Sequence, residues 1–140
     1  MRKLKIGLDI HGVIDSKPEF FEIFSKTLVD AGHEVHILTG PHISDKLKEY
    51  LKKLNISYTH LFSISDYHKE KGTEIHYDDK GDPHLDRWAW DSAKAEYAQQ
   101  HELDLHFDDS DQYKYWFTTP YCRYYSMDTD RIKKIRIGSK

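Results

Sequence analysis

The chain has 140 residues, 32% of them charged, and its formal net charge is -3. That length fits one domain, so we expect a single domain over residues 1–140, and the slightly acidic balance argues against nucleic-acid binding. A single cysteine excludes an internal disulfide and a multi-thiolate metal site, and no apolar run suits a membrane helix or a secretion signal. We therefore expect a cytoplasmic protein without a membrane partner, and the sequence leaves its oligomeric state open.

Strand-like and helix-like segments alternate along the first half of the chain. Short apolar runs predict three strands, and apolar residues at helical spacing predict two helices between them. The strands are expected over residues 4–10, 33–40 and 58–64, and the helices over 16–32 and 44–55.

The second half adds a hairpin before the alternation resumes. Alternating residues on both sides of "DDKGD" predict a β-hairpin over about residues 72–85. A helix is expected over 86–102, a strand over 103–107, a short helix or turn over 111–117 and a last strand over 120–127. The basic segment 131–140 is interpreted as a solvated terminus or an edge strand.

This order of elements predicts an α/β fold. We expect a Rossmann-like three-layer sandwich with a central parallel sheet, and the hairpin as a small insertion. Binding sites in such folds lie beyond the carboxyl ends of the strands, so the residues at those ends are the candidates for chemistry.

Carboxylates follow two of the predicted strands. Asp9 ends the first strand, and Asp108 and Asp109 end the strand that begins at residue 103. Three carboxylates in one crevice repel one another unless a cation lies among them, and oxygen ligands at this density favour Mg²⁺. An aspartate after a strand is often only a turn residue, so each carboxylate alone is weak evidence.

Groups suited to phosphate lie near the same edge. Thr39 offers a hydroxyl at the end of the second strand, and the turn at Gly40 offers backbone N–H groups. Lys94, on the helix before the strand at 103–107, can reach that edge and neutralise phosphate and carboxylates. A lone lysine on a helix is usually solvated, so the order of all these groups along the chain carries the interpretation.

These residues resemble the haloacid-dehalogenase-like (HAD) hydrolase superfamily. "LDIHGVID" is similar to its first motif, D-x-D-G-[T/V] after an apolar strand, and "ILTG" is similar to its second. Lys94 matches the third motif and "HFDDS" the fourth, so the resemblance spans residues 4 to about 126.

The resemblance implies a Mg²⁺-dependent phosphohydrolase acting on a small phosphorylated molecule. It implies that Asp9 is the nucleophile, forming an aspartyl-phosphate. Mg²⁺ is then held by Asp9, the main-chain carbonyl of His11 and Asp108, with Asp109 a ligand directly or through water. It also implies that Thr39 and Lys94 hold the phosphoryl oxygens. Since little beyond the hairpin is inserted between the motifs, the chain resembles a nearly capless member.

His11 departs from the family pattern, which usually has aspartate there as general acid and base. Three interpretations are open: His11 is itself the acid and base, the substrate needs no protonation of its leaving group, or the domain binds without efficient turnover. A fourth is that His11 merely shapes the loop. The alternative function is therefore a catalytically weak or inactive HAD-like domain that binds a ligand or a partner protein.

Other histidines and two tryptophans are interpreted as structural. "HEVH", residues 33–36, enters a strand and lacks the spacing of the zinc-protease helix motif. His68, His76 and His84 could cluster around the hairpin and bind a transition metal, but no fixed ligand spacing supports such a site, so they are interpreted as surface residues. Trp88 and Trp90 are expected to pack the helix that carries Lys94.

Overall fold

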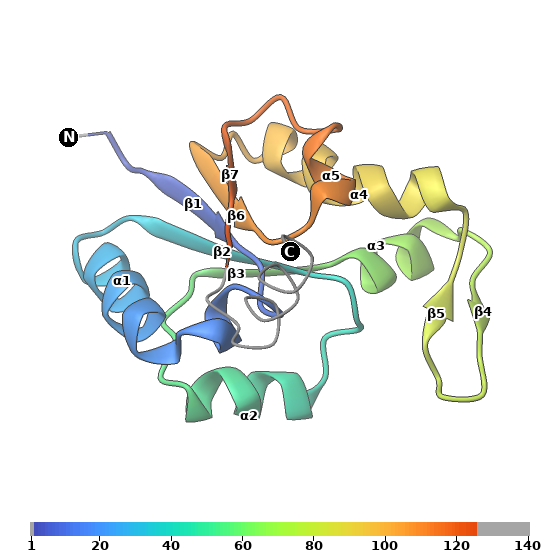
Figure 1. Ribbon diagram of the computed structural model, residues 1–140, viewed down its shortest axis with the longest axis horizontal. Helices are drawn as coiled ribbons and strands as arrows, with labels where there is room; N and C mark the ends of the chain where they lie inside the picture. Colours follow the sequence, from blue (N-terminus) through green and yellow to red (C-terminus); the bar gives the residue numbers. More distant parts are fainter. Residues whose placement is uncertain (1, 126–140) are drawn as a thin grey trace, which may run out of the picture.

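The computed structural model describes residues 2–125 of the chain. The end of the predicted strand 120–127 and the basic segment 131–140 lie outside the described residues. Within them, the expected α/β fold is confirmed: a central parallel sheet is flanked by helices (Figure 1).

The central sheet contains all five strands that the apolar runs predict. They are β1 (Lys5–Leu8), β2 (Glu34–Thr39), β3 (His60–Ser63), β6 (Leu105–Asp108) and β7 (Tyr121–Arg123). The strand order is β3-β2-β1-β6-β7, and every neighbouring pair is parallel. β1 is therefore central, with β2 and β6 on either side, and the carboxyl ends of these three strands meet at one edge of the sheet.

Helices cover both faces of this sheet. The segments are η1 (Ile14–Ser16), α1 (Pro18–Asp30), α2 (Asp45–Lys53), α3 (Ile64–Lys71), α4 (Arg87–Gln100) and α5 (Asp111–Lys114). Phe21 of α1 and Leu51 of α2 join Leu8, Val35 and Ile37 in the larger apolar core. On the opposite face, Leu38 packs with Ala98 of α4 and with Leu103. No helix in the described part of the chain is long and apolar enough to cross a membrane.

Helix α3 was not predicted from the sequence. Its signals are local: the Ser63 hydroxyl caps the first turn by accepting a hydrogen bond from the N–H of Asp66. Gly72 ends the helix in the left-handed region, at φ 83°. The apolar run of the strand passes directly into α3 without a loop, so hydrophobic periodicity alone did not separate the two elements.

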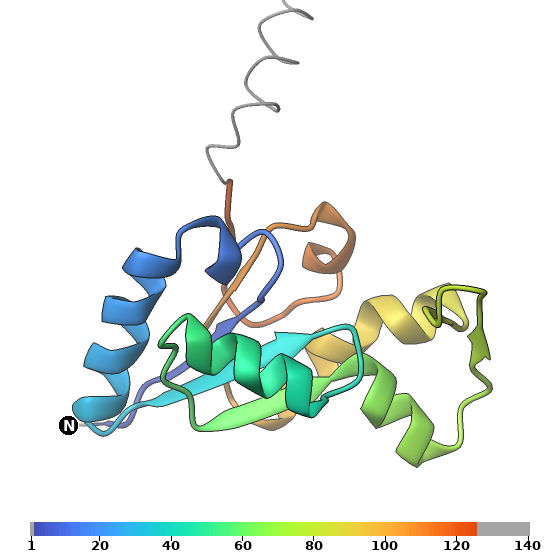
Figure 2. The same ribbon diagram turned by 90° about the horizontal axis from the view of Figure 1, so that it is seen from below.

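The predicted hairpin is confirmed as a separate two-stranded sheet. β4 (His76–Tyr77) pairs antiparallel with β5 (Pro83–His84). Figures 1 and 2 both show this hairpin projecting beyond α3 and α4, away from the central sheet. One side-chain contact links it to the loop after β2, because Tyr77 OH lies 2.9 Å from His42 Nε2.

Candidate active site

The structure brings the predicted site residues together at the carboxyl edge of the sheet. Asp9 directly follows β1, and Thr39 and Asp108 are the last residues of β2 and β6. An open cleft of about 500 Å³ lies at this edge. Its lining includes five of the predicted residues: Asp9, His11, Thr39, Lys94 and Asp109.

Lys94 links the carboxylates at the base of this cleft. It lies on α4 with only 1% of its surface exposed. Its Nζ donates hydrogen bonds to Asp9 Oδ1 at 3.2 Å and to Asp108 Oδ2 at 2.9 Å. The same ammonium lies 4.6 Å from the centre of the Tyr113 ring, within range of a cation–π interaction. A lysine that is usually solvated is therefore buried here as the counter-charge of two carboxylates.

Burial and mutual charge shift the pKa values of this cluster in different directions. Burial raises the pKa of Asp9 to about 7, with the Lys94 charge opposing the rise and the Asp108 charge adding to it. Burial also acts to raise the pKa of Asp108, but a hydrogen bond from His106 and the charge of Lys94 outweigh it and lower the pKa. For Lys94, burial acts to lower the pKa, and the charges of Asp9 and Asp108 outweigh burial and raise it. Asp108 and Lys94 are thus charged at neutral pH, while Asp9 titrates there.

The turn after β1 approaches the third carboxylate closely. Gly12 adopts a left-handed conformation, at φ 83°. A Cβ atom built on it would lie 2.0 Å from Asp109 Oδ2, so a side chain at this position would displace the Asp109 carboxylate. One carboxylate oxygen from each of Asp9, Asp108 and Asp109 lies within 4.8 Å of the others, which is a spacing that a cation can bridge.

The loop after β2 presents an unpaired hydroxyl. Thr39 Oγ1 is buried and has no hydrogen-bond partner among residues 2–125. Two serine hydroxyls fix the backbone that follows Thr39. Ser65 Oγ donates a hydrogen bond to the Gly40 carbonyl at 2.6 Å, and Ser63 Oγ donates one to the Pro41 carbonyl at 2.7 Å. A buried hydroxyl without a partner is costly, so Thr39 is suited to a polar ligand in the cleft.

The two tryptophans of α4 have different environments. Trp88 is 71% exposed, so the prediction that it packs the helix is wrong. Trp90 lines the cleft, and its indole Nε1 donates a hydrogen bond to Tyr113 OH at 2.9 Å. A Cβ atom on Gly40 would lie 2.8 Å from the Trp90 ring, so a glycine is needed where the loop passes this indole.

His11 lies at the rim of the cleft. Its side chain is 65% exposed, and its Nδ1 lies 3.1 Å from Asp15 Oδ2. Asp15 Oδ1 accepts a second hydrogen bond from the N–H of Gly12 at 2.8 Å, which holds the turn in place. The interpretations of His11 as acid and base, as a catalytic handicap or as a loop residue all stay predictions.

The sequence does not predict the burial of His106 and His68. His106 on β6 is fully buried, its Nε2 lies 3.0 Å from Asp108 Oδ2, and its ring stacks on Phe117 at a centroid distance of 5.0 Å. Strand alternation in "LHFD" places residues 106 and 108 on one face, which was the available signal. His68 was expected on the surface, and this prediction is wrong: it is 3% exposed and contacts the Ala89 carbonyl through Nε2 at 2.9 Å.

Comparison with known proteins adds no relative. No protein-family model, curated protein or solved structure matches this chain. Its function is therefore inferred from its own motifs and from the geometry of the cleft.

Proposed function

We propose that this protein is a Mg²⁺-dependent phosphohydrolase of the HAD-like superfamily, acting on a small phosphorylated molecule through an aspartyl-phosphate at Asp9. The observation that carries the proposal is the buried Lys94, shared by Asp9 and Asp108 at the ends of adjacent strands. Asp9, Lys94 and Asp108 occur along the chain in the order of the first, third and fourth HAD-like motifs, and they lie together at this edge of the sheet. Helices on both faces of a parallel sheet also suit the Rossmann-like three-layer sandwich of that superfamily.

The donor set fits Mg²⁺. Asp9, Asp108 and Asp109 offer carboxylate oxygens within 4.8 Å of one another, and Mg²⁺ prefers hard oxygen ligands. When bound, the cation supplies positive charge that offsets the carboxylates and the phosphate. The elevated pKa of Asp9 supports this assignment, because it reports a buried carboxylate whose negative charge is incompletely balanced by Lys94 alone.

The two oxygens of Asp9 are placed differently. Oδ1 accepts hydrogen bonds from the N–H of Ile10 at 2.9 Å and from Lys94 at 3.2 Å. No described residue donates a hydrogen bond to Oδ2, so that oxygen is the better candidate for attack. Its attack on phosphorus forms a bond to Asp9 and breaks the bond to the leaving oxygen, which departs with the electron pair. Water then attacks phosphorus, releases phosphate and restores the carboxylate.

Thr39 and Lys94 are the groups proposed to hold the transferring phosphoryl oxygens. The buried Thr39 hydroxyl lacks a partner that a phosphate oxygen can supply, and Lys94 carries the charge. The hairpin projects away from the central sheet (Figures 1 and 2), which suits a nearly capless enzyme with an open cleft.

An aryl phosphate assay tests the proposal. With p-nitrophenyl phosphate and Mg²⁺, the protein should release p-nitrophenol, and Asp9→Asn should lower turnover on the order of 10³-fold or more. Glu49→Gln, an exposed carboxylate on α2, is the matched control and should leave turnover unchanged. Saturable Mg²⁺ binding without turnover of aryl, acyl or alkyl phosphates would instead support the alternative of a HAD-like binding domain. The observation that favours this alternative is that His11 lies at the rim of the cleft and contacts Asp15.

A further inference from the structure

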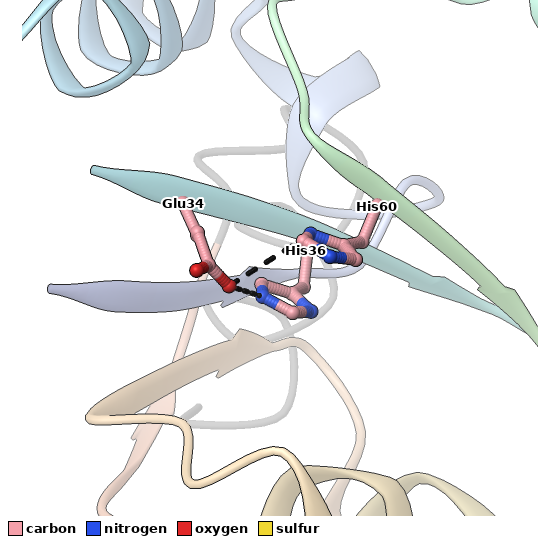
Figure 3. Close-up of side chains that lie close together, drawn as sticks. All are labelled: Glu34, His36 and His60. Carbon is pink, nitrogen blue, oxygen red and sulfur yellow. Dashed lines mark hydrogen bonds and ion pairs between the residues drawn. The ribbon is translucent and has the colours of Figure 1, made fainter. Parts of the chain in front are cut away.

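A second cluster of ionisable side chains lies at the opposite end of β2. Glu34 and His36 are two residues apart on this strand, so their side chains share one face of the sheet. His60, the first residue of β3, is the register partner of His36. Figure 3 shows Glu34 and His36 on β2 and His60 on β3, with Glu34 directed to both histidines.

The ligand atoms of these residues are close together. Glu34 Oε1 lies 2.8 Å from His36 Nε2 and 3.9 Å from His60 Nδ1. One donor atom from each residue lies within 4.8 Å of the other two. Two imidazole nitrogens and one carboxylate oxygen form the His₂Glu donor set that zinc sites with an open position use.

We propose that Glu34, His36 and His60 form a binding site for a divalent transition metal of the Zn²⁺ type. The proposal concerns a site separate from the cleft and does not depend on phosphohydrolase activity. Glu34 and Thr39 lie at opposite ends of β2, about 16 Å apart at the rise of an extended strand. The nitrogen ligands also separate this site from the oxygen-only donors of the cleft, because imidazole suits Zn²⁺ far better than Mg²⁺.

His36 is built as a fixed ligand. It is 1% exposed, and its Nδ1 lies 2.7 Å from Tyr97 OH on α4. A partner on one ring nitrogen sets the tautomer and orients the other nitrogen, which is the usual outer-shell arrangement around a metal-bound histidine. Nε2 is the nitrogen that faces Glu34, 2.8 Å from Oε1, so it is the ring nitrogen that a metal shared with Glu34 would bind.

Metal binding requires a change of tautomer at His36, because Nε2 lies 2.8 Å from Glu34 Oε1 and donates its proton to that carboxylate. With the proton moved to Nδ1, which lies 2.7 Å from Tyr97 OH, Nε2 has a lone pair for the metal. The other groups facing His36 are His60, Tyr97 and His101, the residue that follows α4.

His60 must turn for the metal to bind. The His36 and His60 rings are stacked at a centroid distance of 4.1 Å and an interplanar angle of 4°, so their in-plane lone pairs run parallel and do not converge. The His60 side chain is 43% exposed, and its contact with Thr59 Oγ1 at 2.8 Å is local. It can therefore reorient at low cost, while His36 and Tyr97 stay in place. Water or His101 can complete the coordination.

Zn²⁺ titration of the full chain, without a polyhistidine tag and with excess Mg²⁺ present, tests the site. Calorimetry should give one equivalent of Zn²⁺ with a dissociation constant in the micromolar range or below. His60→Ala and Glu34→Gln should each weaken Zn²⁺ binding more than about 10-fold. Loss of a residue that only orients a ligand already costs about that much, and these variants remove a ligand itself. His84→Ala is the matched control: it removes an exposed histidine paired with Asp78 at 2.8 Å and should leave Zn²⁺ affinity unchanged.

Three further measurements keep the outcome unambiguous. Circular dichroism of His60→Ala checks that the variant is folded, and histidine-ring NMR of the native chain should show Zn²⁺ shifting His36 and His60 but not His84. Asp108→Asn should retain Zn²⁺ binding. If Asp108→Asn loses it, the ion binds at the cleft and the proposal is overturned. The absence of Zn²⁺ binding, or equal affinity in His60→Ala and the native chain, overturns it as well and leaves a purely structural histidine cluster.

Discussion

The two ends of β2 hold ionisable clusters of opposite character. At the carboxyl end, beside Thr39, Asp9 and Asp108 share one buried ammonium, Lys94. At the amino end, Glu34 contacts His36 and the partly exposed His60, and the two imidazole rings are stacked. The first cluster depends on the balance of enclosed charges, and the second joins the buried His36 imidazole to a partly exposed imidazole and a carboxylate.

This difference governs how each cluster responds to change. Enclosed charges interact strongly, and removal of one partner leaves the others uncompensated at a high cost. Partly exposed groups keep water as an alternative partner, so each contact contributes little. The carboxyl edge should therefore dominate both the stability and the chemistry of the molecule, and the amino edge should tolerate substitution.

The largest effect is expected from Lys94→Met, which keeps side-chain length but removes the charge. Two carboxylates, Asp9 and Asp108, are then buried without their cation, and the free energy of unfolding should fall by about 3–5 kcal/mol without Mg²⁺ at pH 8. If Mg²⁺ binds at the cleft as proposed, it should restore part of the loss by stabilising the native state. Urea denaturation with and without Mg²⁺ measures both quantities.

The matched change at the amino edge is Glu34→Gln, which keeps an oxygen acceptor for His36. It should lower the free energy of unfolding by less than about 1 kcal/mol. Equal stability losses for Lys94→Met and Glu34→Gln would show that the two edges are not electrostatically different, and would count against a buried charge network at the cleft.

The pH dependence of Asp9→Asn gives the next largest effect. The folded-state pKa of Asp9 is about 7, above the unfolded value of 3.8, so the native state binds the proton more tightly and loses stability as pH rises between these values. From pH 5 to pH 8 the native chain should lose about 2–3 kcal/mol relative to Asp9→Asn. Denaturant unfolding of both proteins at the two pH values, without metal, measures it. A constant difference across this range would show that Asp9 does not titrate there.

The sequence predicted the carboxyl edge better than the amino edge for a physical reason. Parallel strands bring their ends to one edge whatever their register, so Asp9, Thr39 and Asp108 could be grouped from strand order alone. The amino cluster requires the pairing of His36 with His60 and the face on which they point, and neither follows from one strand at a time. Strand alternation puts residues 34 and 36 of "HEVH" on one face, but this spacing alone does not indicate a metal site.

Residues that position the site without belonging to a motif were also not predicted from the sequence. His106 contacts Asp108 on one strand face. Ser63 at the end of β3 and Ser65 on α3, the helix that was not predicted, hold the loop after β2. Their side chains act on the site through the backbone or through another residue, and no motif marks them. Trp88 is exposed although it was expected to pack the helix, because helical spacing alone does not show which face of a helix meets solvent.

A smaller effect is expected from His106→Phe, which retains a flat ring against Phe117 but removes the hydrogen bond to Asp108. A carboxylate that loses an orienting partner should bind Mg²⁺ about 10-fold more weakly. Calorimetric titration with Mg²⁺ measures this, and His60→Ala at the amino edge is the control with unchanged Mg²⁺ affinity. Equal Mg²⁺ affinities of His106→Phe and the native chain would mean that Lys94 and the N–H of Ser110 suffice to orient Asp108.

The smallest effect is expected at His11, which is 65% exposed and turned to Asp15. His11→Ala should change turnover of an aryl phosphate by less than about 10-fold, because an aryl oxide leaves without a proton and needs no general acid. Alkyl phosphates need that acid, so His11→Asp should raise their turnover by placing a carboxyl group at the rim. Steady-state rates of the three proteins on both substrates measure this. If His11→Ala instead slows alkyl turnover most and removes a histidine-like limb from the pH profile, His11 is the working acid. No change on either substrate, with Asp9→Asn inactive, assigns His11 to the loop alone.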